Sequence, residues 1–128
     1  WVNRILSHSV SHATTFVQWA GIEALKGPQE SIRAMVAEFQ ARRDLLVAGL
    51  AEIGIRCPLP GGAFYVFPDV SEVGGGDRFA ERMLSEAMLA ATPGSAFGPG
   101  GVDHVRISYA ASRERLQQAL ERMGKMLG

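Results

Sequence analysis

A glycine-rich loop that leads into a short alternating run constrains this chain most, because such a run predicts a strand with two different faces. The stretch reads TPGSAFGPGGVDHVRISYA and extends from Thr92 to Ala110. Apolar and polar residues alternate in its second half, and successive side chains of a strand point to opposite sides of a sheet. One side carries Val105, Ile107 and Tyr109, and the other carries His104, Arg106 and Ser108. The stretch therefore predicts a half-buried strand whose polar face holds an arginine.

The position of Arg106 favours anion binding. An arginine that is fixed on a strand beside a flexible loop can bind a carboxylate or a phosphate through two parallel hydrogen bonds. The alternative is a solvated arginine on an exposed sheet face, where a surface ion pair contributes about 0–1 kcal/mol to stability. The alternation alone leaves both interpretations open, so the surrounding sequence has to decide between them.

The other periodicities predict helices that alternate with strands. Apolar residues recur every three or four positions over residues 28–53, as on one face of a long helix, and Gly54 supplies the residue that ends it. Bulky residues over 63–68 predict a strand, and a shorter apolar run over 88–92 predicts another. Further helices are expected at residues 14–26, with Phe16, Val17, Ala20, Ala24 and Leu25 buried, at 77–87 with Asp77 as N-cap, and from the N-cap Ser112 onwards.

This order of elements predicts an α+β fold. Helices can cover only one face of so small a sheet, so we expect three or four short, mostly antiparallel strands with helices packed on one side. A hydrophobic content of 47% and a charged content of 20% over 128 residues are typical of one soluble globular domain. The sequence contains a single cysteine, Cys57, and therefore no internal disulfide, which favours the cytoplasm.

Charge and hydropathy also exclude two classes of partner. The formal net charge is zero and the 13 basic residues are scattered, so we expect no nucleic-acid-binding surface. The sequence has no apolar run of about twenty residues, so we expect no membrane span.

Three stretches together resemble one enzyme family. PGSAFGPGG followed by HVRISYA, within residues 93–110, resembles the segment of the fold-type I, pyridoxal-phosphate-dependent aminotransferases of class I/II that carries the arginine binding the substrate's α-carboxylate. GGAFYVFPDV (61–70) is similar to another strand of that family's small domain, and SHSVSHATTFVQWAGIEAL (7–25) resembles the end of its large domain. The stretches follow the order found in the aspartate aminotransferase family along almost the whole chain.

The resemblance implies a division of the chain into residues 1–27, a remnant of the large coenzyme-binding domain, and residues 28–128, the C-terminal small domain with the connecting helix 28–53. Members of the family are much longer than 128 residues, so the resemblance implies a C-terminal fragment. The only lysines, Lys26 and Lys125, match no Schiff-base context. We therefore expect pyridoxal 5′-phosphate to bind only in the longer protein and the chain to be inactive alone.

The resemblance also implies site residues. Arg106 becomes the clamp for the substrate's α-carboxylate. Phe64 and Tyr65 are candidates for substrate binding, with a place in the core as the alternative for both. Ser9 and Ser11 are candidates for approaching the coenzyme phosphate of a neighbouring subunit.

Some positions depart from the family's usual residues. Val10, His12 and Ala13 replace common small polar residues and a proline, and Met88 stands where a glycine is common at a helix end. His8 and His12 are spaced like a helical metal-binding pair, but no adjacent glutamate or third ligand accompanies them, so we expect no metal site.

As an enzyme, the chain would be part of a transaminase that exchanges an amino group between an amino acid and a 2-oxo acid, with aspartate as the family's usual substrate. The resemblance implies a homodimer. Lyases and synthases of the same fold use the same arginine and remain an alternative. Two further alternatives are the ligand-sensing domain of a transcriptional regulator, behind a winged-helix domain, and a free-standing binding or dimerisation module.

Overall fold

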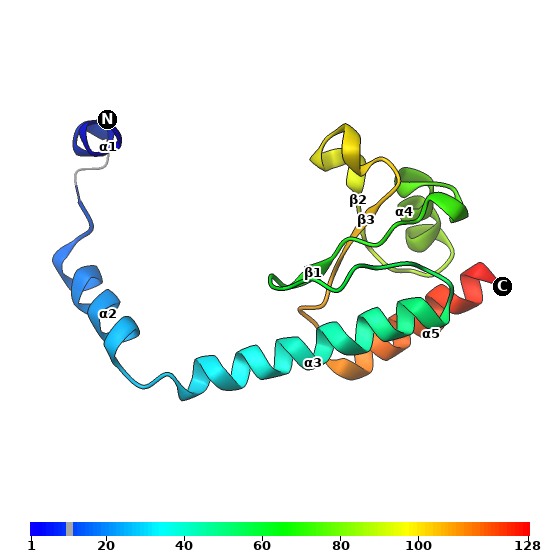
Figure 1. The fold of residues 1–128 in the computed structure, drawn as a ribbon, viewed down its shortest axis with the longest axis horizontal. Coiled ribbons are helices and arrows are strands. Elements are labelled where there is room, and N and C mark those ends of the chain that lie inside the picture. Colours follow the sequence, from blue (N-terminus) through cyan, green and yellow to red (C-terminus); the bar gives the residue numbers. More distant parts are fainter. Residues whose placement is uncertain (10–11) are drawn as a thin grey trace. The chain divides into compact units, whose positions relative to one another are not determined.

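The computed structural model describes residues 1–9 and 12–128, which divide into two compact units, residues 1–34 and 35–128 (Figure 1). The first unit contains α1 (Val2–Ser9), α2 (Thr15–Lys26) and the start of α3 (Glu30–Glu52). Neither α1 nor α2 has a buried residue. The prediction of a buried side for residues 14–26 is therefore wrong for this chain, because no described residue packs over that side.

The second unit is built on a three-stranded antiparallel sheet with the strand order β1-β3-β2. The strands are β1 (Tyr65–Val66), β2 (Thr92–Pro93) and β3 (Val105–Ser108). In the middle of β3, Arg106 pairs with Thr92 of β2, and its neighbour Ile107 pairs with Val66 of β1. The α+β fold with a small antiparallel sheet, predicted from the sequence, is confirmed.

The core lies on one face of this sheet. The end of α3, together with α4 (Gly76–Ser85) and α5 (Arg113–Leu127), contributes side chains that pack with those of the strands. The best-buried members of this core are Leu46, Leu50, Ile55, Val66, Val70, Phe79, Met83, Val105, Tyr109 and Met123. All three helices therefore cover the face of β3 that the alternation predicted to be apolar, and the other face is left open.

The connection from β2 to β3 depends on a close approach of two glycines. It consists of two short 3-10 turns, η2 (Gly94–Phe97) and η3 (Pro99–Gly101). A Cβ atom on Gly94 would overlap the carbonyl of Gly101, and a Cβ atom on Gly101 would overlap that of Gly94. Only glycine at both positions lets the turns close against each other, and this fixes where Phe97 lies.

Several local predictions need correction. Asp77 is not the N-cap of α4; that place belongs to Gly75, whose φ of 82° few other residues adopt. The strand expected over 63–68 is reduced to β1, since Ala63 has a φ of 68° and leaves the extended conformation. The run 88–92 is not a strand except at its end, because Met88 adopts the left-handed conformation, with a φ of 55°, that explains the family's glycine there.

Two further features of the second unit are the start of α5 and the short turn before α4. Ser112 caps α5 as predicted, and its hydroxyl accepts a hydrogen bond from the backbone N–H of Arg115 at 3.4 Å. A third 3-10 turn, η1 (Ser71–Val73), precedes α4. None of the helices in the described residues has the length and apolar character needed to cross a membrane.

Candidate functional site

Arg106 lies in the middle of the open sheet face, on the central strand β3. Its neighbours on the strand, Val105 and Ile107, are buried beneath the helices, so the Arg106 side chain must point the other way. The side chain is partly buried, and its Nη2 atom donates a hydrogen bond of 3.4 Å to the hydroxyl of Thr92 on β2. The sheet thus holds the base of this arginine rigidly while its tip stays accessible.

Two aromatic rings flank the tip of Arg106. Its guanidinium carbon lies 4.8 Å from the ring centre of Phe97, which ends η2, and 5.6 Å from that of Tyr65 on β1. Both distances are within the range of about 6 Å over which an aromatic ring attracts a cation. The arginine is therefore held by rings from two separate segments.

No carboxylate pairs with Arg106 among residues 1–9 and 12–128. Six other arginines do form ion pairs with acidic side chains: Arg33, Arg42, Arg43, Arg56, Arg82 and Arg113. A partly buried guanidinium without such a partner retains N–H donors for an external anion. Anion binding by Arg106, expected from the sequence, therefore stays a prediction with which these surroundings are consistent.

A hollow of about 460 Å³ opens on the same face. Tyr65, Phe67 and His104 line one part of it, and the proline- and glycine-rich segment before β1 lines the rest. The rings of Phe67 and His104 are stacked, with centres 5.0 Å apart, and the Nδ1 atom of His104 is buried without a hydrogen-bond partner among the described residues. Most of the surface that lines the hollow is apolar, so it suits the apolar part of a ligand whose charge binds nearby.

The other predicted site residues have different surroundings. Tyr65 contacts Arg106, whereas Phe64 is 54% exposed and contacts the Tyr65 ring edge to face, with centres 5.5 Å apart. Phe64 is therefore not part of the core. Ser9 lies at the end of α1 and its hydroxyl donates to the carbonyl of Ile5 at 2.9 Å, and Ser11 lies outside the described residues.

The two lysines lie on helices rather than on the sheet. Lys26 ends α2, and Lys125 lies in the last turn of α5, which packs on the covered side of the sheet. The described residues contain no cluster of histidine, cysteine and acidic side chains that would hold a metal ion.

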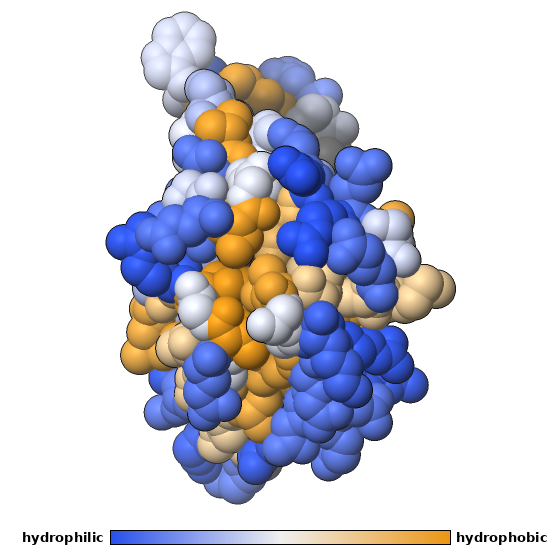
Figure 2. Space-filling model, turned by 90° about the vertical axis from the view of Figure 1, so that its right-hand side faces the viewer, coloured by the Kyte–Doolittle hydropathy of each residue, from blue (hydrophilic) through white to orange (hydrophobic). Residues whose placement is uncertain are grey.

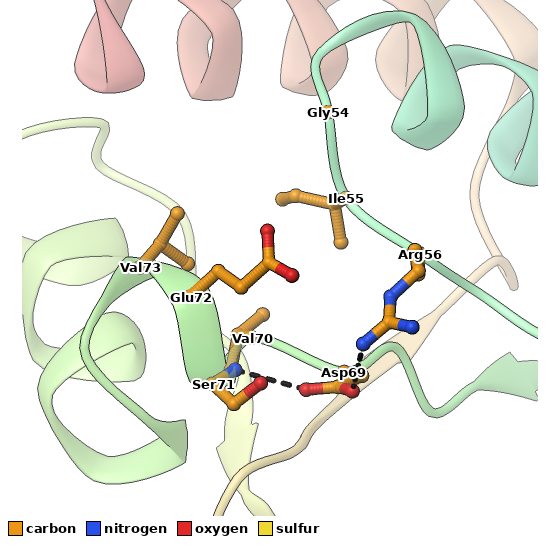
Figure 3. A pocket seen from close by; sticks show the side chains of 8 residues that line it. All are labelled: Gly54, Ile55, Arg56, Asp69, Val70, Ser71, Glu72 and Val73. Carbon is orange, nitrogen blue, oxygen red and sulfur yellow. Dashed lines mark hydrogen bonds and ion pairs between the residues drawn. The ribbon is translucent and has the colours of Figure 1, made fainter.

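A second hollow, between the end of α3 and η1, is too small to be a binding site (Figure 3). Its volume for water-sized groups is about 10 Å³, close to the room for a single water molecule. Asp69 at its edge accepts a hydrogen bond from the Ser71 backbone at 2.9 Å and pairs with Arg56 at 3.0 Å. Hydrogen bonds from Ser71 and the charge of Arg56 lower the pKa of the Asp69 carboxyl. These contacts hold the segment before η1 against the segment that contains Arg56.

Sequence reasoning missed Phe97 and Thr92 as neighbours of Arg106. The signal for Phe97 is weak but real: it is the one aromatic residue in an otherwise small-residue loop, PGSAFGPGG, directly before the arginine strand. Thr92 has no signal of its own, because its position depends on the register of β2 against β3.

The fold is that of a small α+β domain whose open sheet face carries an arginine with no carboxylate partner among the described residues. Over residues 1–123 the sequence matches the family model of aminotransferases of class I and II, and the chain belongs to this family. It is 44% identical to the aspartate/prephenate aminotransferase of Thermus thermophilus over 129 residues, and 39% identical to the aspartate aminotransferase of Pyrococcus abyssi over 132. These alignments cover 97% and 98% of this chain but only 32% and 34% of those proteins.

Solved structures give the same result. The crystal structure of the aromatic aminotransferase from Pyrococcus horikoshii is similar to this structure with a TM-score of 0.89 and 39% sequence identity, over 97% of this chain and 34% of that one. The aspartate aminotransferase from Thermus thermophilus with maleate is similar with a TM-score of 0.80 and 42% identity. The chain therefore spans about a third of the length of the relatives it matches.

Proposed function

We propose that this chain is the C-terminal part of a pyridoxal-phosphate-dependent aminotransferase, in which Arg106 binds the α-carboxylate of the amino acid substrate. The observation that carries the proposal is the Arg106 guanidinium, which is partly buried on the open sheet face and has no carboxylate partner among the described residues. Membership of the aminotransferase family supports it. Residues 1–27 would belong to the large domain and residues 28–128 to the small domain.

The described residues of the open face fit the substrate better than the coenzyme. Arg106 and the Thr92 hydroxyl offer donors for a carboxylate, and the Tyr65 ring offers apolar surface. Ser9, the candidate for the coenzyme phosphate, uses its hydroxyl hydrogen within α1 and would have to turn it outward to donate. The lysine that holds the coenzyme would therefore come from the rest of the longer protein, and Ser9 and Ser11 would at most add hydrogen bonds to its phosphate.

In this mechanism, Arg106 fixes one end of the substrate. A planar guanidinium binds a carboxylate through two parallel hydrogen bonds, which set the orientation of the carboxylate plane as well as its position. With the carboxylate fixed, the Cα–H bond of the amino acid has one orientation in which it can lose its proton. Pyridoxal phosphate, when bound, supplies the electron sink for that step.

The partners follow from the same proposal. The substrates would be an amino acid and a 2-oxo acid, and the protein would be a cytoplasmic homodimer. Large apolar side chains of the first unit support association, since Trp1, Phe16, Trp19 and Leu25 are all more than two thirds exposed. Apolar surface of this extent is usually covered by another domain or subunit.

The test uses the full-length product of the gene in an assay with an amino acid donor and a 2-oxo acid acceptor. Because hydrogen bonds to charged groups contribute about 1.5–3 kcal/mol each, Arg106→Ala should lower kcat/KM about a hundredfold or more. Arg106→Lys keeps the positive charge but loses the two parallel N–H groups, so its kcat/KM should lie between those of the unchanged protein and of Arg106→Ala. Arg122→Ala is the matched control, because Arg122 is an exposed arginine of α5, on the other side of the sheet.

Two outcomes would reject the proposal. If Arg106→Ala leaves kcat/KM within a factor of about two of the unchanged protein, Arg106 does not bind the substrate. If the coenzyme-loaded protein consumes the amino acid without any need for a 2-oxo acid, the reaction is that of a lyase or synthase rather than an amino-group transfer.

A further inference from the structure

We propose that Tyr65 and Phe97 are positioning residues whose rings hold the two faces of the Arg106 guanidinium and leave its edge free for the carboxylate. This inference rests on the proposed function of Arg106 and adds the groups that prepare it for binding. It also explains how an arginine with no acidic partner in the described part of the chain can keep one position on an open sheet face.

The three side chains converge from three separate segments. Arg106 comes from the central strand, Tyr65 from the neighbouring strand β1, and Phe97 from the last residue of η2. The guanidinium carbon lies over both rings, 4.8 Å from the centre of Phe97 and 5.6 Å from that of Tyr65. Their convergence therefore depends on the tertiary fold and not on closeness in sequence.

The rings are themselves braced by other aromatic side chains. Phe97 meets the ring of Phe67 edge to face, with centres 6.0 Å apart and planes inclined by 80°. Tyr65 meets Phe64 in the same way, at 5.5 Å and 89°. Such edge-to-face pairs are favourable geometries and restrict the motion of both partners. This bracing gives exposed Phe64 a role that neither the core nor a direct substrate contact would require.

The geometry matters because a guanidinium has two distinct surfaces. Its faces stack on aromatic rings, whereas its N–H groups lie in the plane and bind carboxylates. In Arg82, which pairs with Glu86 at 2.9 Å and 3.1 Å, an acidic side chain occupies the edge. Around Arg106, the guanidinium carbon lies 4.8 Å from the ring centre of Phe97 and 5.6 Å from that of Tyr65, and among the described residues the neutral Thr92 hydroxyl is the hydrogen-bond partner of its N–H groups, at 3.4 Å. Contact with the rings thus fixes the arginine and leaves N–H groups for the substrate.

Holding the side chain in advance strengthens binding. A mobile arginine side chain loses rotamer freedom when a ligand immobilises it, and this loss weakens binding. The close approach of Gly94 and Gly101 fixes the turn that carries Phe97. Gly98, the residue after Phe97, has a φ of 114°, which favours glycine at that position. The glycine-rich loop therefore positions the Phe97 ring over the Arg106 guanidinium.

The experiment measures KM and kcat of the full-length holoenzyme, together with the Kd of a non-reacting carboxylate, succinate, by calorimetry. Phe97→Leu and Tyr65→Leu keep apolar volume but remove the ring, whereas Phe97→Tyr and Phe97→Trp keep a ring. We expect each leucine variant to raise KM and Kd about two- to fivefold, and the double variant about tenfold, with a smaller change in kcat. Val102→Ala, an exposed apolar residue just before β3, is the control for non-specific effects.

A double-mutant cycle separates positioning from direct contact. If the rings act through Arg106, Phe97→Leu should have no further effect on Kd in the Arg106→Ala background. An equal rise for Phe97→Leu and Phe97→Trp would overturn the inference, as would a Phe97→Leu effect that persists without Arg106. If one leucine variant fails to fold, the KM of Phe97→Trp is compared with that of the other. Tryptophan is the stronger cation–π partner, so Phe97→Trp should have the lower KM. Failure of Arg106→Ala itself to raise Kd would instead reject the proposed function.

Discussion

The two faces of the small sheet are built from alternate residues of the same strands, yet they differ in almost every physical property. On the covered face, Val105 is 0% and Ile107 8% exposed, and both pack against helices. On the open face, Arg106 and His104 are partly buried, Ser108 is exposed, and aromatic rings stand in place of helices. A single strand thus carries the core on one side and the candidate site on the other.

This difference shows how the domain combines stability with an accessible charge. The covered face removes apolar surface from water and so fixes the position of β3. Because the side chains of the open face are attached to the same strand, their backbone positions are fixed although they are not buried themselves. Helices α1 and α2 differ from both faces of the sheet, because they have no buried residue and their large apolar side chains are exposed. Figure 2, a view of the side on which α4 and the C-terminus lie in Figure 1, shows a band of apolar side chains between hydrophilic ones.

The largest effect on stability should come from the covered face. Phe79→Ala removes a fully buried ring of α4 and should lower the free energy of unfolding by about 3–5 kcal/mol. Phe97→Ala, the matched change on the open face, removes a ring that is 53% exposed and should lower it by about 1 kcal/mol or less. Chemical denaturation of both variants checks the comparison, and equal losses would show that the two faces are not different in kind.

Gly94→Ala should affect both faces through one backbone contact. The added Cβ would overlap the Gly101 carbonyl, so the turn has to open, at a cost of about 1–3 kcal/mol. Opening the turn would also move Phe97 away from Arg106 and weaken carboxylate binding. Gly100→Ala is the control, because a Cβ there meets nothing within 4 Å. Thermal unfolding and a carboxylate-binding titration of both variants measure the two consequences; identical behaviour would refute the role of the close approach.

Tyr109→Phe should have an intermediate effect that is confined to the covered face. The Tyr109 hydroxyl donates to the Ala63 carbonyl at 3.0 Å, and burial of the ring raises the pKa of this phenol. Losing that hydrogen bond should cost about 1 kcal/mol and loosen the segment before β1. Tyr65→Phe removes a hydroxyl from the open face and should cost less. Denaturant unfolding decides, and a larger loss for Tyr65→Phe would contradict the account.

The smallest effect concerns acid stability. Hydrogen bonds from Arg113 and Arg42 lower the pKa of the Glu38 carboxyl, which links α3 to α5. A lowered folded-state pKa means that this carboxylate stabilises the fold above its unfolded pKa of about 4.3, and that the contribution is lost as the pH falls through the folded-state value. Glu38→Gln should therefore lower the unfolding temperature slightly at pH 7, and this difference should shrink as the pH falls. A difference that grows toward low pH would show that the sign is wrong.

Much of the fold could be predicted because its signals are local. The period of two in β3, and the periods of three and four in α5 and in the second half of α3, indicated which sides face the core, and Ser112 indicated the start of α5. The apolar stripe in the first half of α3 is exposed, at Met35 and Val36 for example. The predictions failed where the backbone leaves ordinary conformations, at Gly75, Ala63 and Met88. They also failed for the apolar side of α2, since periodicity shows that a side is apolar but not whether a partner covers it.

Of the residues in the candidate site, the sequence and its family resemblance pointed to Arg106 and Tyr65 only. Arg106 stands out because an alternating strand and a glycine loop bracket it, and the family resemblance gives it a role. Its neighbours Phe97 and Thr92 come from parts of the chain whose distance to Arg106 depends on strand register and on a turn held by two glycines. Contacts of that kind follow from tertiary packing, so the sequence offers only a weak signal for Phe97, as the one aromatic residue of its loop, and none for Thr92.

The most direct measurement of the central claim is a crystal structure of the full-length protein with a bound substrate-like dicarboxylate. The account predicts that one carboxylate accepts two parallel hydrogen bonds of about 2.7–2.9 Å from the edge of Arg106, with Tyr65 and Phe97 against its faces. A carboxylate bound by another residue, with Arg106 paired to an acidic side chain of the protein, would contradict it.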